Sequence, residues 1–435
     1  MKKFIRKRDE TMNMNKVIRY VNTNRGNGRK ESLDRIYLLL DRLGNPQDEL
    51  SYIHITGTNG KGSTASFFQS VLMEAGLRVG LFTSPHLEVV NERIRINNQY
   101  IADEDFIRIV EQIEPVVLEI EEQIGEKFYA FELMTTVAFM YFKEQQPDVV
   151  VLEAGIGGRL DSTNVIKTVD VSVITSIGID HVSTLGNTRE AIMNEKVQIL
   201  KENGHLVVGP VENSLQQIAD EWAKQVDGKV TFIHPEDIEV LSTSKNAQTF
   251  TYKSFKNVEL SFLGLHQMEN VAVVLEACKL LIEKGYPLDE AVIYEGLKKA
   301  SWPGRFEKVM DQPLFYIDGA HNMASVDRLI ETLKEIFPNE TFHFVMGMMK
   351  DKEYEEMIEK VLPLSKEFLV ISPDPSRGFD ALRVANDLQS RGYEATAFAN
   401  MEEVLSYIEE NIPKEDVVIQ FGSLYLVGEV KKALG

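Results

Sequence analysis

The sequence has almost no cysteine and no long apolar run. Cys278 is the one cysteine among 435 residues, so no disulfide can form within the chain, and a reducing compartment suits it. Because it lies in an apolar helical run, we expect a buried core thiol. The basic start M-K-K-F-I-R-K-R is followed by D-E-T-M rather than by an apolar segment. We therefore predict neither a secretion signal nor a membrane span.

Positive charge is also scarce. There are 47 Lys and Arg against 67 Asp and Glu, and the net charge of −20 argues against a broad nucleic-acid surface. A nucleotide is not excluded, because it needs only a local pocket of N–H groups and a few cations. The length, with 43% hydrophobic and 26% charged residues, predicts a soluble, cytoplasmic globular protein of two or three domains.

The most informative stretch is I-H-I-T-G-T-N-G-K-G-S, which runs from Ile53 to Ser63. A short apolar run leads through three glycines and a lysine into a helix-favouring segment. Glycines let the backbone turn tightly and bring N–H groups to an anion, and a helix N-terminus adds positive dipole. We predict a strand, a phosphate-binding loop and a helix, although Gly62 separates Lys61 from Ser63 and the first glycine of G-x-x-x-x-G-K-[ST] is replaced by Ile55. The alternative is a glycine-rich turn that only joins a strand to a helix.

Helical and strand patterns alternate along the rest of the first 300 residues. Apolar spacing predicts helices within 15–45, interrupted by a loop at 25–30, and over 103–123 and 129–146. Strands are expected at 78–82 and 149–152, and the N-N turn of N-E-R-I-R-I-N-N-Q-Y-I predicts a small hairpin. A helix from Thr188, short strands between 230 and 265 and helices over 266–282 and 289–297 complete this part.

Polar residues follow the predicted strands at the edge where parallel sheets bind ligands. Ser84 follows one strand, Glu153 ends another, and Asp180 and His181 follow a third. A carboxylate beside a phosphate loop can hold magnesium, so Glu153 is a candidate ligand. The alternative for Glu153 is a structural ion pair with Arg159, and for His181 a structural role remains open.

A second set of alternating elements follows S-W-P-G-R at 301–305, where proline and glycine interrupt both periodicities. We place a hinge there, between domains 1–300 and 306–435. Strands are predicted near 314–317, 341–346, 367–371, 394–398 and 416–421. The prediction is an α/β protein: an N-terminal domain with a phosphate loop and a mostly parallel sheet, and a smaller, Rossmann-like C-terminal domain across a cleft.

Eight motifs together resemble the folylpolyglutamate synthase and dihydrofolate synthase family, ATP-dependent amide ligases related to the Mur peptidoglycan ligases. They cover almost the whole chain from about residue 15 in the family's order. The motifs are G-T-N-G-K-G-S at 57, T-S-P-H-L at 83, N-E-R-I-R-I-N at 91, E-A-G-I-G-G-R-L-D-S-T-N at 153, G-I-D-H at 178, H-Q-M-E-N at 266, W-P-G-R-F-E at 302 and D-G-A-H-N at 318.

The resemblance implies ATP and Mg²⁺ as cofactors, with two metal sites, and a role for each matching residue. The implied phosphate-loop residues are Gly57, Thr58, Asn59, Gly60, Lys61, Gly62 and Ser63. The implied magnesium ligands are Ser84, Glu153 and His181, and the implied nucleotide contacts from the hinge and second domain are Asn270, Arg305, Asp318 and His321. The implied catalytic set is Lys61, His181, Lys196, Arg305, Asp318 and His321.

Lys196 matches a lysine that is carbamylated in this family, a modification that turns a cation into a carboxylate-like metal ligand. The sequence departs from the family here, because E-K-A-G-I becomes E-K-V-Q-I. Bulkier Val197 and polar Gln198 therefore follow the lysine. From the sequence alone, the alternative is a solvated helix lysine.

The implied reaction adds L-glutamate to the γ-carboxyl of (tetrahydro)folate polyglutamates through an acyl phosphate, and addition to dihydropteroate stays open as a second activity. The expected partners are small molecules (folate or dihydropteroate, L-glutamate and ATP), with no nucleic acid, no membrane and a monomeric chain. Three alternatives remain. They are a Mur-superfamily ligase acting on another substrate, such as a cell-wall nucleotide peptide, a nucleotide-binding paralogue with impaired catalysis, and a phosphate-loop kinase or NTPase.

Overall fold

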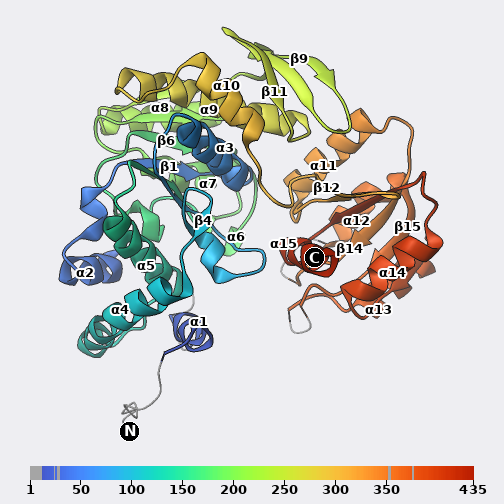
Figure 1. The fold of residues 1–435 in the computed structure, drawn as a ribbon, viewed down its shortest axis with the longest axis horizontal. Coiled ribbons are helices and arrows are strands. Elements are labelled where there is room, and N and C mark those ends of the chain that lie inside the picture. The colour runs from blue at the N-terminus through green and yellow to red at the C-terminus, as the bar shows by residue number, and fades with distance from the viewer. Residues whose placement is uncertain (1–11, 24, 27–29, 351–353, 375–376) are drawn as a thin grey trace, which may run out of the picture.

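The computed structural model describes residues 12–23, 25–26, 30–350, 354–374 and 377–435. Three β-sheets organise this part of the chain, with eight, three and six strands. The strands of the first two sheets precede residue 301, and those of the third follow residue 305 and lie to the right in Figure 1. The expectations for residues 1–11, and for 27–29 within the predicted loop, lie outside the described residues.

The eight-stranded sheet carries the predicted phosphate loop on a central strand. Its order is β4-β3-β2-β5-β1-β6-β7-β8. The six neighbouring strands β2, β5, β1, β6, β7 and β8 are parallel, and the antiparallel strands β3 and β4 form the predicted hairpin at one edge. The strands are β1 Tyr52–Thr56, β2 Val79–Phe82, β3 Ile94–Ile96, β4 Gln99–Tyr100, β5 Val149–Glu153, β6 Val171–Ile174, β7 His205–Val208 and β8 Lys229–Phe232. Every residue of β1 and β5 is buried, which is typical of a parallel sheet covered on both faces.

Helices cover both faces of this sheet (Figure 1). One face packs against α3 Lys61–Glu74, α9 Leu265–Glu283 and α10 Glu290–Lys299. The other packs against α1 Met14–Asn22, α2 Asp34–Arg42, α4 Asp103–Ile124 and α5 Ala130–Gln145. Beyond β6 and β7 lie α6 Val182–Leu185, α7 Arg189–Lys196 and α8 Asn213–Gln225. The predicted helices and the predicted burial of Cys278 are confirmed.

The short strands predicted between 230 and 265 form a separate antiparallel sheet. Its order is β11-β10-β9, and it packs over the α9 and α10 side of the molecule (Figure 1). The strands are β9 Ile238–Thr243, β10 Gln248–Tyr252 and β11 Phe255–Leu260. The sequence predicted these strands but not their pairing, because period-two patterns do not say which strands are neighbours.

The C-terminal sheet has the order β12-β13-β17-β14-β15-β16. Its strands are β12 Glu307–Asp311, β13 Leu314–Ile317, β14 Phe342–Met346, β15 Ser365–Val370, β16 Ala395–Ala397 and β17 Val417–Phe421. Apart from the antiparallel edge strand β12, they are parallel and were all predicted. The helices are α11 Met323–Ile336, α12 Tyr354–Val361 and α13 Ala381–Ser390 on one face, and α14 Met401–Asn411 and α15 Leu424–Leu434 on the other. The sequence missed β12 because E-K-V-M-D at the sheet edge is half exposed and charged.

Within the described ranges, no helix combines the length and the apolar character that crossing a membrane requires. This agrees with the absence of a long apolar run in the sequence.

In the C-terminal sheet, a histidine on β14 lies between two carboxylates, one on β15 and one just before β17. On β14, His343 contacts Glu367 through Nδ1 at 2.6 Å and Asp416 through Nε2 at 2.8 Å. Tyr407 donates to the same glutamate and Lys366 to the same aspartate. Burial alone would lower the pKa of His343, but the two carboxylates outweigh it and raise the pKa.

This raised pKa makes the stability contributed by His343 depend on pH. The contribution is fully present below the unfolded-state pKa of about 6.5 and is lost as the pH rises through the higher folded-state pKa. We expect His343→Gln to lower the free energy of unfolding in urea by about 2 kcal/mol at pH 6 and by much less at pH 9. The control is His205→Gln. Burial lowers the pKa of His205, so the loss of unfolding free energy in this variant should not shrink with rising pH. An equal loss at both pH values for His343→Gln would contradict the prediction.

Candidate functional site

The carboxyl ends of four neighbouring strands meet at one cavity of about 700 Å³. The strands β2, β5, β1 and β6 deliver, in that spatial order, Ser84, Glu153, the phosphate loop and the pair Asp180–His181. Helix α9 and the C-terminal unit supply the facing wall. The expected site residues that line the cavity are Thr58, Asn59, Gly60, Lys61, Gly62, Ser63, Ser84, Glu153, His181, Asn270, Arg305, Asp318 and His321. The other two, Gly57 of the loop and Lys196, are not among the lining residues and contact each other.

Close packing explains why glycines are needed in the phosphate loop. A Cβ on Gly57 would lie 1.9 Å from Thr175 Oγ1, and one on Gly60, whose φ is +86°, would lie 2.5 Å from Asn270 Oδ1. Helix α3 begins directly afterwards at Lys61, so its first N–H groups have no partner within the helix. Lys61 Nζ curls back to donate to the Gly57 carbonyl at 3.1 Å. These features favour a phosphate-binding loop over the alternative of a glycine-rich turn that only joins a strand to a helix.

Glu153 is a buried carboxyl at the end of β5. It is 3% exposed, and it accepts a hydrogen bond from the Ser84 backbone N–H at 3.4 Å. Burial raises its pKa to about 7, against the lowering effects of Lys61, the Ser84 N–H and nearby arginines. Arg159 pairs instead with Glu195 at 2.8 Å, so the alternative of a structural Glu153–Arg159 pair is wrong.

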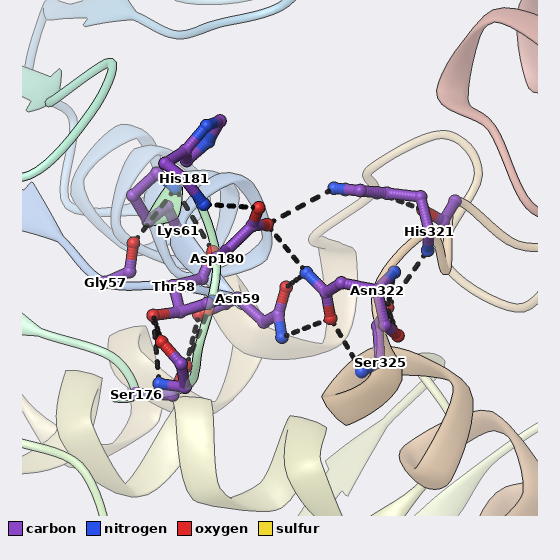
Figure 2. A network of polar contacts seen from close by, with 12 residues as sticks. Gly57, Thr58, Asn59, Lys61, Ser176, Asp180, His181, His321, Asn322 and Ser325 are labelled. Carbon is purple, nitrogen blue, oxygen red and sulfur yellow. Dashed lines mark hydrogen bonds and ion pairs between the residues drawn. The ribbon is translucent and has the colours of Figure 1, made fainter. Parts of the chain in front are cut away.

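The third expected metal ligand, His181, lines the same cavity. It is the N-cap residue of the short helix α6, it is exposed, and Figure 2 shows its ring pointing away from Asn322. No group of three or more His, Cys, Asp or Glu side chains in the described residues is arranged to hold a metal ion. This does not conflict with Mg²⁺, which is commonly bound by one or two carboxylates together with water and substrate phosphates. The oxygen donors Glu153 and Ser84 fit such an ion.

Lys196 is not a solvated lysine. It is 3% exposed at the end of α7, and its Nζ donates to the Gly57 carbonyl at 2.8 Å. Burial, with Lys61 nearby, holds its pKa well below the usual lysine value. The two unusual residues that follow Lys196 make contacts of their own. Val197 packs in the core beside α8, and Gln198 donates to the Asn194 carbonyl.

The C-terminal unit brings its own charged groups to the cavity. Asp318, at the end of β13, accepts hydrogen bonds from the backbone N–H groups of Phe306 and Ala320, both at 2.8 Å. Burial raises its pKa, with Arg305 acting in the opposite sense. From α9, His266 also lines the cavity, and burial and two nearby arginines lower its pKa to about 3, so its ring is neutral.

Several cavity residues were not assigned by the sequence. Arg93 lies in a quoted motif and lines the cavity, where its Nε contacts His86 Nδ1 at 2.9 Å. Arg328 on α11 pairs with Glu269 on α9 at 3.1 Å, and no motif marks it. Asn322, which is not among the residues that line the cavity, bridges the two units (Figure 2), and its only signal in the sequence was its place in D-G-A-H-N.

Comparisons with known proteins agree with this geometry. Residues 55–278 match the Mur ligase middle domain and residues 304–424 the Mur ligase glutamate ligase domain. The two matched domains, the phosphate loop and the cavity between the two α/β units define a Mur-type ligase.

Full-length relatives narrow the class. The chain is 35% identical to the dihydrofolate synthase/folylpolyglutamate synthase of Bacillus subtilis, covering 94% of this chain and 96% of that one. It is 33% identical to the folylpolyglutamate synthase of Lacticaseibacillus casei, over 97% and 99% of the two chains. The crystal structure of folylpolyglutamate synthase from Thermotoga maritima superimposes with a TM-score of 0.84 at 35% identity, covering 96% of each chain. The chain belongs to the folylpolyglutamate synthase and dihydrofolate synthase family.

The packing of the loop against the segment 301–305 is testable at Gly62. A Cβ there would lie 2.6 Å from Trp302 Nε1, so the indole must move if the site is to hold alanine. In a Trp222→Phe background, we expect Gly62→Ala to shift the emission of Trp302 and to lower the free energy of unfolding by about 1–3 kcal/mol. The control is Gly178→Ala, whose Cβ would meet Thr58 Cγ2 at 3.5 Å and Ala324 Cβ at 3.6 Å, which are ordinary van der Waals distances. Unchanged emission for Gly62→Ala would contradict the packing.

Proposed function

We propose that this chain is an ATP-dependent ligase that adds L-glutamate to the γ-carboxyl of a (tetrahydro)folate polyglutamate. The observation that supports it most is the convergence of a phosphate loop, a buried carboxyl and the cations of a second unit on one cavity. The cavity also has an aromatic and aliphatic side suited to a flat ring system, lined by Tyr129, Phe131, Ile156, Leu160 and Leu185. A related folylpolyglutamate synthase, 31% identical with a TM-score of 0.83 and covering 97% and 100% of the two chains, was solved with AMPPCP and folate.

The proposed reaction has two steps. A carboxylate oxygen of folate attacks the γ-phosphorus of ATP, the bond to ADP breaks, and an acyl phosphate forms. The glutamate amine then attacks the acyl carbon, and phosphate leaves from the tetrahedral intermediate while the nitrogen loses a proton. Lys61 and the N–H groups of the loop would bind the phosphates and Arg305 would meet the transferring group. Asp318 and His321 would contact the ribose side or that group, and Asn270 the nucleotide.

Mg²⁺ at Ser84, Glu153 and His181 would neutralise phosphate charge in this scheme. The surroundings of Glu153 support this, because a buried carboxyl with a pKa of about 7 gains a partner for its charge when a cation binds. A second Mg²⁺ would lie nearer Lys196. The segment 301–305 would act as the hinge between domains 1–300 and 306–435, and closure would keep water from the acyl phosphate. The monomeric state and the cytoplasmic location stay predictions.

A carbamate on Lys196 would supply the oxygen ligands for that second ion. Its lowered pKa favours the neutral amine, whose nitrogen can attack carbon dioxide and release a proton to water. We expect ¹³C NMR of protein equilibrated with ¹³C-bicarbonate to show a carbamate signal that Lys196→Met removes. Lys201→Met is the control, because burial lowers the pKa of that lysine too, to about 8, yet its amine contacts Asn164 rather than the loop. A signal lost only in Lys201→Met, or none in the wild type, would refute the carbamate.

The bifunctional name of the Bacillus subtilis relative favours a second activity, the addition of glutamate to dihydropteroate. Two measurements separate the two activities. They are the release of phosphate from Mg-ATP in the presence of glutamate and each acceptor, and the masses of the products. We expect release that depends on a tetrahydrofolate and adds one glutamyl mass, and a parallel response to dihydropteroate if the enzyme is bifunctional. Lys61→Ala should lower turnover at least about a hundredfold with the fold intact. Activity with a cell-wall nucleotide peptide instead, or near-normal ligation by Lys61→Ala, would overturn the proposal.

A further inference from the structure

We propose that Asn322 is a positioning residue that sets the C-terminal unit on the phosphate loop; this inference rests on the proposed function. Its side-chain Nδ2 donates to Asn59 Oδ1 at 3.1 Å and to Asp180 Oδ2 at 2.9 Å. Its Oδ1 accepts from Asn59 Nδ2 at 3.3 Å and from the Ser325 N–H at 2.9 Å. Both amide hydrogens and both lone pairs of this side chain, which is 7% exposed, are therefore used. Three of the four hydrogen bonds join the two units.

On the first unit, the partners of Asn322 are themselves held rigidly. The Asn59 backbone N–H donates to Ser176 Oγ at 3.0 Å, and its carbonyl accepts from Ser176 Oγ and from Thr175 Oγ1. The other oxygen of Asp180 accepts from the His181 N–H at 2.7 Å. The loop is thus tied to the segment that follows β6, and Asn322 contacts both the loop and that segment (Figure 2).

On the C-terminal unit, Asn322 is equally fixed. It caps α11, and the Ser325 hydroxyl accepts from the backbone N–H of Asn322 and of His321, both at 3.0 Å. The preceding Asp318 carboxylate accepts from the Ala320 N–H, and the Gly319 N–H donates to the Gly304 carbonyl at 2.9 Å. A shift of Asn322 therefore moves the segment that carries Arg305, Asp318 and His321.

The competing explanation is that Asn322 only caps its helix. The chain contains a matched control, since Asn400 caps α14 in the same unit by accepting from the Glu403 N–H at 2.9 Å, away from the cavity. Serine is about as good an N-cap as asparagine. If Asn322 only capped its helix, Asn322→Ser and Asn400→Ser would therefore have similar, small effects, but only Asn322→Ser removes the contacts to Asn59 and Asp180.

The first measurement is steady-state ligation together with the distance between the units. Cysteines placed at the exposed positions Asp220 on α8 and Glu410 on α14 can take a fluorophore pair, because the native Cys278 is buried. We expect Asn322→Ser to lower kcat about tenfold, as loss of buried hydrogen bonds predicts, and to lower energy transfer with a non-hydrolysable ATP analogue. The KM for folate should change less than about twofold, because Tyr129 and Phe131 of the first unit line that side. Asn400→Ser should change neither quantity.

An exchange of partners gives a second, independent test. Asn322→Asp keeps the cap but sets a carboxylate against Asp180, so energy transfer should fall further than in Asn322→Ser. The double variant Asp180→Asn with Asn322→Asp restores the contact between positions 180 and 322 with donor and acceptor exchanged, but not the donation to Asn59 Oδ1, so it should recover part of the energy transfer lost in Asn322→Asp. A double variant no better than Asn322→Asp, or an Asn322→Ser that matches Asn400→Ser in kcat and energy transfer, would overturn the proposal. If the wild type fails to ligate glutamate to folate, the proposed function fails, while the energy-transfer measurements still decide the role of Asn322.

Discussion

The close approach of other segments to the phosphate loop is the constraint on which the site depends. Three of its glycines are each covered by a different part of the chain: Gly57 by the end of β6, Gly60 by Asn270 of α9, and Gly62 by Trp302 of the connection to the C-terminal unit. A side chain at any of these positions would push away the segment packed against it. The loop is therefore also the surface on which the sheet, helix α9 and the connection are packed.

The electrostatics of the site follow from this packing. Burial beside the loop disfavours the charged forms of Glu153 and Lys196, so the pKa of Glu153 rises and that of Lys196 falls. Groups in this state have lost hydration and respond strongly to a new charge nearby. A phosphate chain and a divalent cation would bring charges of both signs, and their binding would give the buried acid and the cations partners of opposite charge.

Much of this arrangement could be predicted from the sequence because it depends on local patterns. Buried parallel strands are continuous apolar runs, and their polar ends, such as Glu153 and Asp318, fall at one edge of a sheet. The features that the sequence did not predict either lack a local apolar pattern or depend on contacts distant in the chain. The edge strand β12 has no apolar run, and the burial of Lys196 comes from the loop 139 residues earlier rather than from its own helix, whose neighbours Val197 and Gln198 gave no sign of it. The pairing of β9 to β11 into their own sheet likewise depends on contacts distant in the chain.

Asn322 shows the same limit at the level of a single side chain. In the structure it caps α11 by accepting from the Ser325 N–H. Its remaining contacts are made with the first unit, where its partners precede it by 263 and 142 residues. A short side chain that caps a helix has its remaining donors fixed in direction by the cap itself. A cap that also contacts a second unit is therefore well suited to pass the orientation of one unit to the other, because neither its helix nor its partner can turn without breaking a hydrogen bond.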